Sequence, residues 1–162
     1  MFHKRLLSLA ALLVLLVFPV SAYMVSVMVI ETGLTEDVSS LPHASVWEGG
    51  LMDALFESGH IATNNPQTRA FRKPAQDFSG IFEDDYFEAK AGGVEYFILC
   101  YLEYQNRNGV PAPVKIEIKL YRIDPKRLVF EQSFPLGSGS DNSEEYKIAK
   151  TAGQRIISQI KD

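Results

Sequence analysis

The chain has 162 residues, 46% of them hydrophobic and 22% charged, which is the size and composition of one globular domain. Its formal net charge of −4 argues against a nucleic-acid-binding protein, because such proteins bind phosphates through an excess of Lys and Arg. The single cysteine, Cys100, excludes an internal disulfide and any metal site built mainly from thiolates.

Residues 1–22 have the layout of a secretory signal peptide. A basic start at residues 3–5 is followed by an apolar run over residues 6–18, and the segment ends in small residues at Ala22. We therefore expect cleavage after Ala22, a single mature domain over residues 23–162, and a periplasmic or secreted location.

The alternative is an uncleaved anchor. Residues 6–30 together are long enough for one membrane span, which needs about 20 apolar residues. Pro19 interrupts this run, and residues 23–30 are needed as a strand. Membrane association is therefore expected only if the signal segment stays uncleaved.

The first half of the expected domain alternates strands and helices. Residues 24–30 are apolar on both faces and rich in β-branched side chains, which is typical of a strand inside a sheet. Residues 46–58 repeat apolar side chains at three- and four-residue intervals, which predicts a helix that Gly59 ends in the left-handed conformation. A short strand is expected over residues 60–63 and a short helix over residues 81–91.

The second half is predicted to form a meander and a closing helix. Residues 94–104 are apolar on both faces, which predicts a central strand in which Cys100 is buried and inert. Residues 114–120 alternate strictly between apolar and charged side chains, which predicts a strand with one face in water. After a hairpin connection, a second strand is expected over residues 128–134, with these side chains on one face: Leu128, Phe130, Gln132 and Phe134. The closing helix is expected over residues 143–160.

This order of elements predicts an α/β fold. We expect a mixed twisted sheet of about five strands with two main helices and one short helix packed on it. Gly49 and Gly50 lie inside the first expected helix, where glycine is unfavourable, and close packing of that helix on the sheet would explain them.

The residue types that carry catalysis or bind metals do not form a motif. His43 and His60 lie far apart and belong to no metal-binding pattern. The acidic run at residues 83–85 lacks the spacing of a calcium loop and is expected to be the solvated start of a helix. Neither a phosphate-binding loop nor a nucleophile motif occurs. We therefore expect no catalytic residue, no metal and no cofactor.

The least regular stretch, residues 67–80, mixes basic and aromatic side chains. This composition is typical of a protein-contact surface, although some of the aromatic side chains are needed in the core. The candidate partner surface consists of Arg69, Phe71, Arg72, Lys73 and Phe78.

Several stretches resemble the α/β module at the amino end of the periplasmic protein TolB, which is related in shape to the envelope proteins LpoB and CsgG. They are the strand at residues 25–30, LMDALFESG at residues 51–59 and AKAGGVEYFI at residues 89–98. With the hairpin at residues 114–134 and the closing helix, the resemblance covers nearly all of residues 23–162. It implies a protein without catalytic residues that binds other envelope proteins, or assembles, through sheet edges, loops and termini.

Two functions remain open at this point. The first is an exported, non-catalytic protein-interaction or assembly module of a bacterial envelope, whose partners are other envelope proteins. The alternative is a small-ligand-binding protein or hydrolase with a pocket between the sheet and residues 66–93. A closed apolar pocket with convergent polar groups would favour the ligand, whereas a filled core would favour the module.

Overall fold

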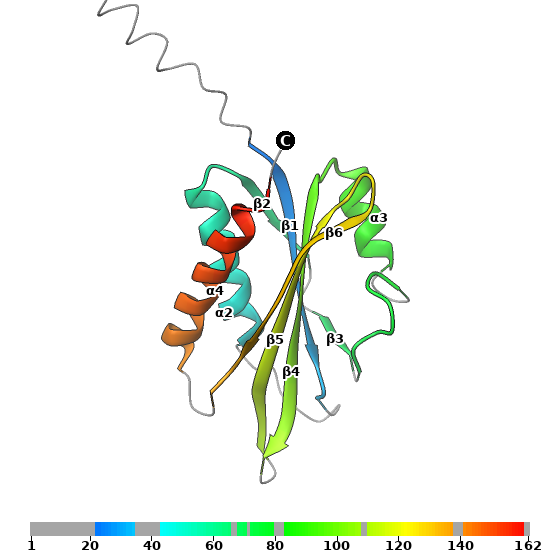
Figure 1. Cartoon of the computed structure of the whole chain (residues 1–162). Helices are drawn as coiled ribbons and strands as arrows, with labels where there is room; N and C mark the ends of the chain where they lie inside the picture. Colours follow the sequence, from blue (N-terminus) through cyan, green and yellow to red (C-terminus); the bar gives the residue numbers. More distant parts are fainter. Residues whose placement is uncertain are drawn as a thin grey trace, which may run out of the picture.

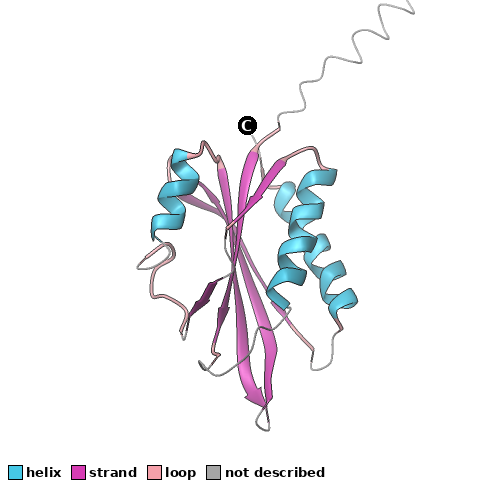
Figure 2. Ribbon diagram, turned by 180° about the vertical axis from the view of Figure 1, so that it is seen from behind, coloured by secondary structure: helices cyan, strands magenta, loops and turns pink. Residues whose placement is uncertain are grey.

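The computed structural model describes residues 22–34, 43–65, 68–70, 72–79, 83–107, 110–137 and 141–160. The expected signal peptide up to residue 21 and Phe71 of the candidate partner surface lie outside these ranges. Within them, a mixed sheet carries two helices on one face and one helix on the other (Figures 1 and 2).

The sheet has six strands, one more than the sequence predicted. The strands are β1 (Met24–Thr32), β2 (Ile61–Asn64), β3 (Thr68–Ala70), β4 (Tyr96–Arg107), β5 (Val110–Arg122) and β6 (Arg127–Pro135), and the helices are α2 (His43–Glu57), α3 (Glu83–Ala91) and α4 (Asn142–Ile157). The order is β2-β1-β4-β5-β6, and β3 pairs with the far end of β1. β1 is parallel to β2, β3 and β4, whereas β4, β5 and β6 form an antiparallel meander. The predicted α/β class and mixed sheet are confirmed.

Helices α2 and α4 cover one face of the sheet and pack closely on each other. Trp47, Leu51 and Leu55 of α2 are fully buried against this face. A Cβ atom added at Gly50 would lie 2.6 Å from the Cβ of Ala149 in α4. The glycine is therefore required by the contact between the two helices, and the expectation that it serves packing on the sheet is wrong.

Helix α3 and residues 72–79 cover the opposite face. Phe78 fills the space beneath them, with its ring centroid 4.9 Å from those of Tyr86 and Phe97 and 5.0 Å from that of Tyr121. Its φ of 55° is unusual for a residue with a bulky side chain, and the burial of the ring offsets this unfavourable backbone conformation. Phe78 is thus a core residue.

A bulge changes which side chains of β6 face the core. Leu120 is opposite Phe130 and Tyr121 is opposite Leu128, so Val129 has no counterpart on β5. The extra residue reverses the alternation, and Leu128 is 42% exposed while Val129 packs against the core. The expected common face of Leu128 and Phe130 is therefore wrong.

β4 and β5 extend beyond their neighbours. The pairing of β1 with β4 ends at Glu103, and the pairing of β6 with β5 ends at Lys115. Beyond these points the two strands pair only with each other, as far as Arg107 and Val110. We call this projection the β4–β5 arm; it forms the lower end of the molecule in Figure 1.

Candidate functional site

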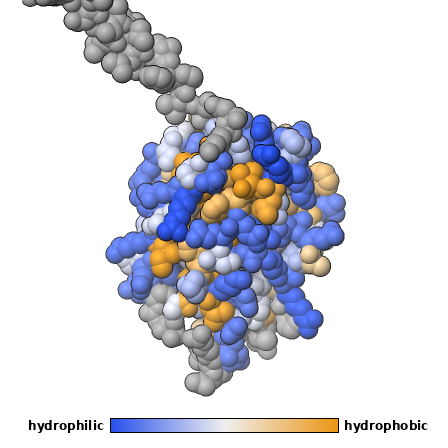
Figure 3. All heavy atoms as spheres, in the orientation of Figure 1, coloured by the Kyte–Doolittle hydropathy of each residue, from blue (hydrophilic) through white to orange (hydrophobic). Residues whose placement is uncertain are grey.

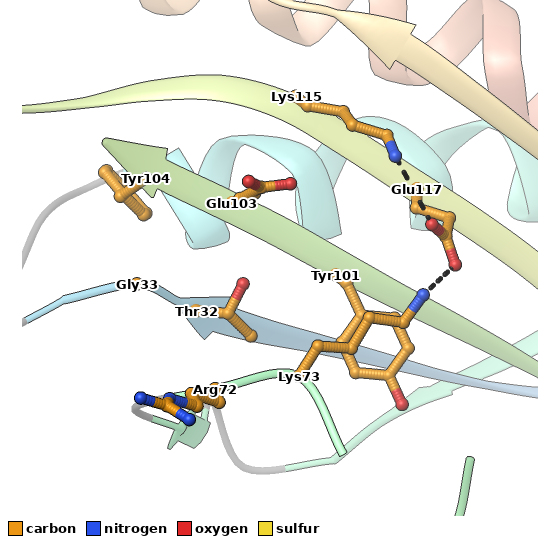
Figure 4. A pocket seen from close by; sticks show the side chains of 9 residues that line it. All are labelled: Thr32, Gly33, Arg72, Lys73, Tyr101, Glu103, Tyr104, Lys115 and Glu117. Atoms are coloured by element: carbon orange, nitrogen blue, oxygen red, sulfur yellow. Dashed lines mark hydrogen bonds and ion pairs between the residues drawn. The ribbon is translucent and has the colours of Figure 1, made fainter. Parts of the chain in front are cut away.

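A hollow of about 300 Å³ lies at the base of the β4–β5 arm, between the sheet and residues 72–73 (Figure 4). It opens to solvent, and most of the side chains around it are charged or polar. The hollow is lined by Thr32, Gly33, Arg72, Lys73, Tyr101, Glu103, Tyr104, Lys115 and Glu117.

Glu117 connects the lysines on this side of the sheet. Its carboxylate pairs with Lys73, lies 3.5 Å from Lys115 Nζ, and lies 3.2 Å from Lys119 Nζ. Burial alone would raise the pKa of Glu117, but hydrogen bonds from Lys73 and Lys119 and the charges of both lysines lower it below the usual value. Lys73 also lies over the ring of Tyr101, with Nζ 4.8 Å from the ring centroid.

Asp77 holds residues 72–79 on the sheet. Its carboxylate accepts hydrogen bonds from Lys119 Nζ at 2.8 Å, from the Tyr101 hydroxyl at 2.9 Å and from the Tyr121 hydroxyl. Burial would raise the pKa of Asp77, but these hydrogen bonds and the charge of Lys119 together lower it. Burial and the neighbouring Asp77 carboxylate raise the pKa of Tyr101, so its hydroxyl stays protonated as a donor.

This covering segment changes the environment of β5. The alternating pattern predicted a face in water, yet the side chains of Glu117 and Lys119 are only 12% and 11% exposed. Their charges face one another and Asp77 beneath the segment rather than solvent. The prediction was wrong at these positions, because a loop with its own charged side chains can cover a charged face at little cost.

The candidate partner surface is divided by the fold. Arg69 donates from Nε to the buried Glu31 carboxylate at 2.8 Å, and Phe78 lies in the core. Arg72 and Lys73 lie together at the hollow. Of the four described members, Arg72 and Lys73 therefore lie at the same solvent-open site, whereas Arg69 and Phe78 lie elsewhere. Phe71 lies outside the described residues.

A buried carboxylate on the opposite face of the sheet was missed from sequence. Glu145 in the first turn of α4 is 0% exposed, and it lies 2.9 Å from His43 Nδ1 and accepts a hydrogen bond from Trp47 Nε1 at 3.2 Å. An acid in the first turn of a helix indicates by itself only a favourable interaction with the helix dipole. The pairing of α2 with α4, rather than any local pattern, brings His43 and Trp47 to it.

The described residues contain no group of three or more His, Cys, Asp or Glu side chains that could hold a metal ion. His60 lies apart from His43, and its Nδ1 accepts a hydrogen bond from the backbone of Tyr23 at 3.3 Å. Partial burial lowers the pKa of His60. None of the helices in the described part of the chain is both long and apolar enough to cross a membrane.

No family model matches this chain, and no curated protein matches it either. Solved structures are similar to it. The PelC dodecamer from Paraburkholderia phytofirmans is 16% identical with a TM-score of 0.48, and the match covers 86% of this chain and 88% of that one. TolB from Acinetobacter baumannii is 9% identical with a TM-score of 0.44, over 86% of this chain and 28% of that one.

The LpoB C-terminal domain from Salmonella enterica is 12% identical with a TM-score of 0.44, and the match covers 79% of this chain and 92% of that domain. TolB and LpoB, which the sequence resembles, are thus among the solved structures to which the chain is similar.

Proposed function

We propose that this chain is an exported, non-catalytic module that binds or assembles with other proteins of a bacterial envelope. The signal-peptide layout of residues 1–22 and the resemblance of residues 23–162 to the TolB-like module support this proposal. The module would begin at Tyr23, in a periplasmic or secreted protein.

The observation that carries the proposal is how the charged side chains of residues 72–79 are used. Asp77 and Lys73 form ion pairs that fix the segment on the sheet, and they do not converge on a closed cavity. Arg72 is exposed beside them, at an open hollow next to a projecting arm. A rigid surface of mixed charge is suited to recognition of another protein, because complementary charges select the partner.

Site-specific photocrosslinking in the native envelope tests this surface. A photoreactive amino acid in place of Arg72 should capture an envelope protein. The same amino acid in place of Arg122, which is exposed at the other end of β5, should not. Arg72→Glu should weaken capture by about tenfold and leave the melting temperature almost unchanged, because exposed substitutions have small effects on stability.

The proposal would be contradicted if both positions captured equally. It would also be contradicted if no crosslinked protein were recovered after extraction in several detergents. Arg122→Glu is the matched charge-reversal control and should retain capture. The start of the exported protein is checked separately by amino-terminal sequencing: Tyr23 supports cleavage after Ala22, and Met1 would favour the uncleaved anchor.

The hollow itself favours a second candidate, a small-ligand-binding protein. It lies between the sheet and residues 72–73, inside the region where the ligand pocket was expected, and Arg72, Lys73 and Lys115 contribute positive charge. Its volume is at the lower end of the range for ligand pockets. A rise in melting temperature with phosphate or citrate that Lys115→Gln abolishes would support this candidate over the module.

A further inference from the structure

β6 forms one open edge of the sheet. Among the described strands it pairs only with β5, so the backbone groups on its other side have no strand partner. The bulge at Val129 interrupts its regular geometry, which leaves residues 130–135 as the regular part of the edge. Such an edge is a template on which another strand can pair.

A groove of about 520 Å³ runs beside this edge, between β6 and α4. Phe134 on the strand and Ile148 on the helix supply its apolar surface, and both are only partly buried against the core. Figure 3, which views the molecule from the β6 side, shows hydrophobic side chains in patches among hydrophilic ones. An occupant would therefore cover apolar surface as well as backbone.

The charges along α4 are arranged so that a second copy fits this groove. Glu144 in the first turn and Arg155 in the last turn both line it. Among the ion pairs of the described residues, none includes either side chain. Two antiparallel copies of α4 would bring Glu144 of each toward Arg155 of the other. Lys147, the other charged residue lining the groove from α4, lies one turn from Glu144 on its own helix.

We propose that two copies of this chain associate through antiparallel pairing of β6, with Gln132 on the two-fold axis. This inference goes beyond the proposed function, because it concerns a different surface and needs no envelope partner. The same patch on both copies makes the interface self-complementary, which is the usual arrangement in symmetric dimers.

The register follows from the side chains of β6. A two-fold axis perpendicular to the sheet keeps both copies of α4 on one face, so the axis must pass a residue rather than the gap between two residues. Centring on Glu131 would oppose two carboxylates, which is unfavourable. Centring on Gln132 places Phe130 opposite Phe134 twice and Glu131 opposite Ser133. The aromatic pairs add to the apolar contact on the groove side.

A disulfide tests the register. In Gln132→Cys the two thiols meet at the axis, and Cys100 does not compete because it is fully buried. Leu128→Cys is the matched control: it is exposed on the same strand, but its two copies would lie eight positions apart across the pairing. Under mild oxidation the Gln132→Cys protein should form a covalent dimer at least about tenfold faster than the control. Equal rates would overturn the register.

Charge reversal tests the dimer independently. Sedimentation should show a reversible dimer of the mature protein, and Glu144→Arg or Arg155→Glu alone should weaken it by about tenfold, because each places like charges together twice. An equimolar mixture of the two variants should recover association, since both contacts in the mixed dimer are again Arg to Glu.

Recovery in the mixture separates the dimer contact from any effect of the variants on folding, because each chain keeps its own substitution. A wild-type protein that stays monomeric at every concentration, or a mixture that associates no better than the single variants, would overturn the proposal.

Discussion

Two acidic side chains hold the segments outside the sheet in place. Glu145 joins the first turn of α4 to the start of α2, through His43 and Trp47. Asp77 joins residues 72–79 to β4 and β5 on the other face. Both carboxylates have lost much of their hydration, and the hydrogen bonds that they accept offset that loss. Each is therefore more important to stability than its chemical type suggests.

Glu145→Ala should lower the free energy of unfolding by about 3 kcal/mol, because the substitution removes the acceptor shared by the partly buried His43 imidazole and the buried Trp47 indole. The control is Glu144→Ala, an exposed acid in the same turn, which should cost about 0.5 kcal/mol through the helix dipole alone. Urea denaturation measures both variants, and equal losses would show that the buried hydrogen bonds contribute little.

Asp77 should make the protein less stable in acid. The pKa of Asp77 is lower in the folded protein than in the unfolded chain, so the unfolded state takes up the proton first as the pH falls. The free energy of unfolding should therefore decrease as the pH falls below about 5, where an unperturbed carboxyl group begins to protonate. Glu117 contributes in the same direction, because its pKa is also lowered.

Asp77→Asn should weaken this acid dependence and cost about 1–3 kcal/mol at neutral pH, since Lys119 and the two tyrosines lose a charged acceptor. Asp84→Asn, at an exposed position on α3, is the control and should keep the wild-type pH profile. Denaturation curves between about pH 2 and pH 7, a range that spans the usual titration of carboxyl groups, measure the effect. Parallel profiles for wild type and Asp77→Asn would contradict it.

The contact between α2 and α4 depends on the absence of a side chain at one position. A Cβ at Gly50 would lie 2.6 Å from the Cβ of Ala149 and 2.8 Å from the carbonyl oxygen of Tyr146, so the helices would have to move apart. Gly50→Ala should therefore destabilise the protein by about 2 kcal/mol despite its better helix propensity.

Gly49→Ala is the matched control, because its nearest neighbour would be Tyr146 Cε2 at 3.9 Å. The gain in helix propensity should stabilise that variant by up to about 1 kcal/mol. Thermal denaturation of the two neighbouring variants should thus give shifts of opposite sign. A stabilising Gly50→Ala would mean that the two helices separate easily.

Elements with a long periodic pattern could be predicted from the sequence. β4 is apolar on both faces and lies between β1 and β5, and α2 shows a clear apolar stripe. β3 was missed because three residues carry no periodic pattern, and it exists only by pairing with β1. The exposure of Leu128 was missed because a bulge at Val129 reverses the alternation of β6, and the bulge is defined by the pairing with β5 rather than by a local pattern.

The candidate site was predictable only in part. Basic side chains in an irregular segment pointed to residues 69–73, and Arg72 and Lys73 do line the hollow. The acidic groups that complete it come from other elements: Glu117 from β5 and Glu103 from β4. Contacts between elements that are distant in sequence depend on the register of the sheet, which local patterns do not specify.

At the scale of the whole molecule, one sheet separates two cores that share its central strands. Leu99 of β4 belongs to the layer beneath α3, and Cys100 beside it belongs to the layer beneath α2 and α4. Both side chains are fully buried, so loss of either layer would disturb the strand that supports the other. We therefore expect residues 23–162 to unfold in one cooperative transition.

Cys100 can test this cooperativity, because it is buried at the centre of β4 and the desolvation of its thiol raises its pKa. In the native protein a thiol reagent should label Cys100 at least about 10³-fold more slowly than in the unfolded chain, since labelling requires global opening. The logarithm of the labelling rate should then rise with denaturant with the slope of equilibrium unfolding. Glu145→Ala should accelerate labelling by the factor that its loss of stability predicts, whereas a rate independent of denaturant would show that β4 opens locally and that the two layers are not coupled.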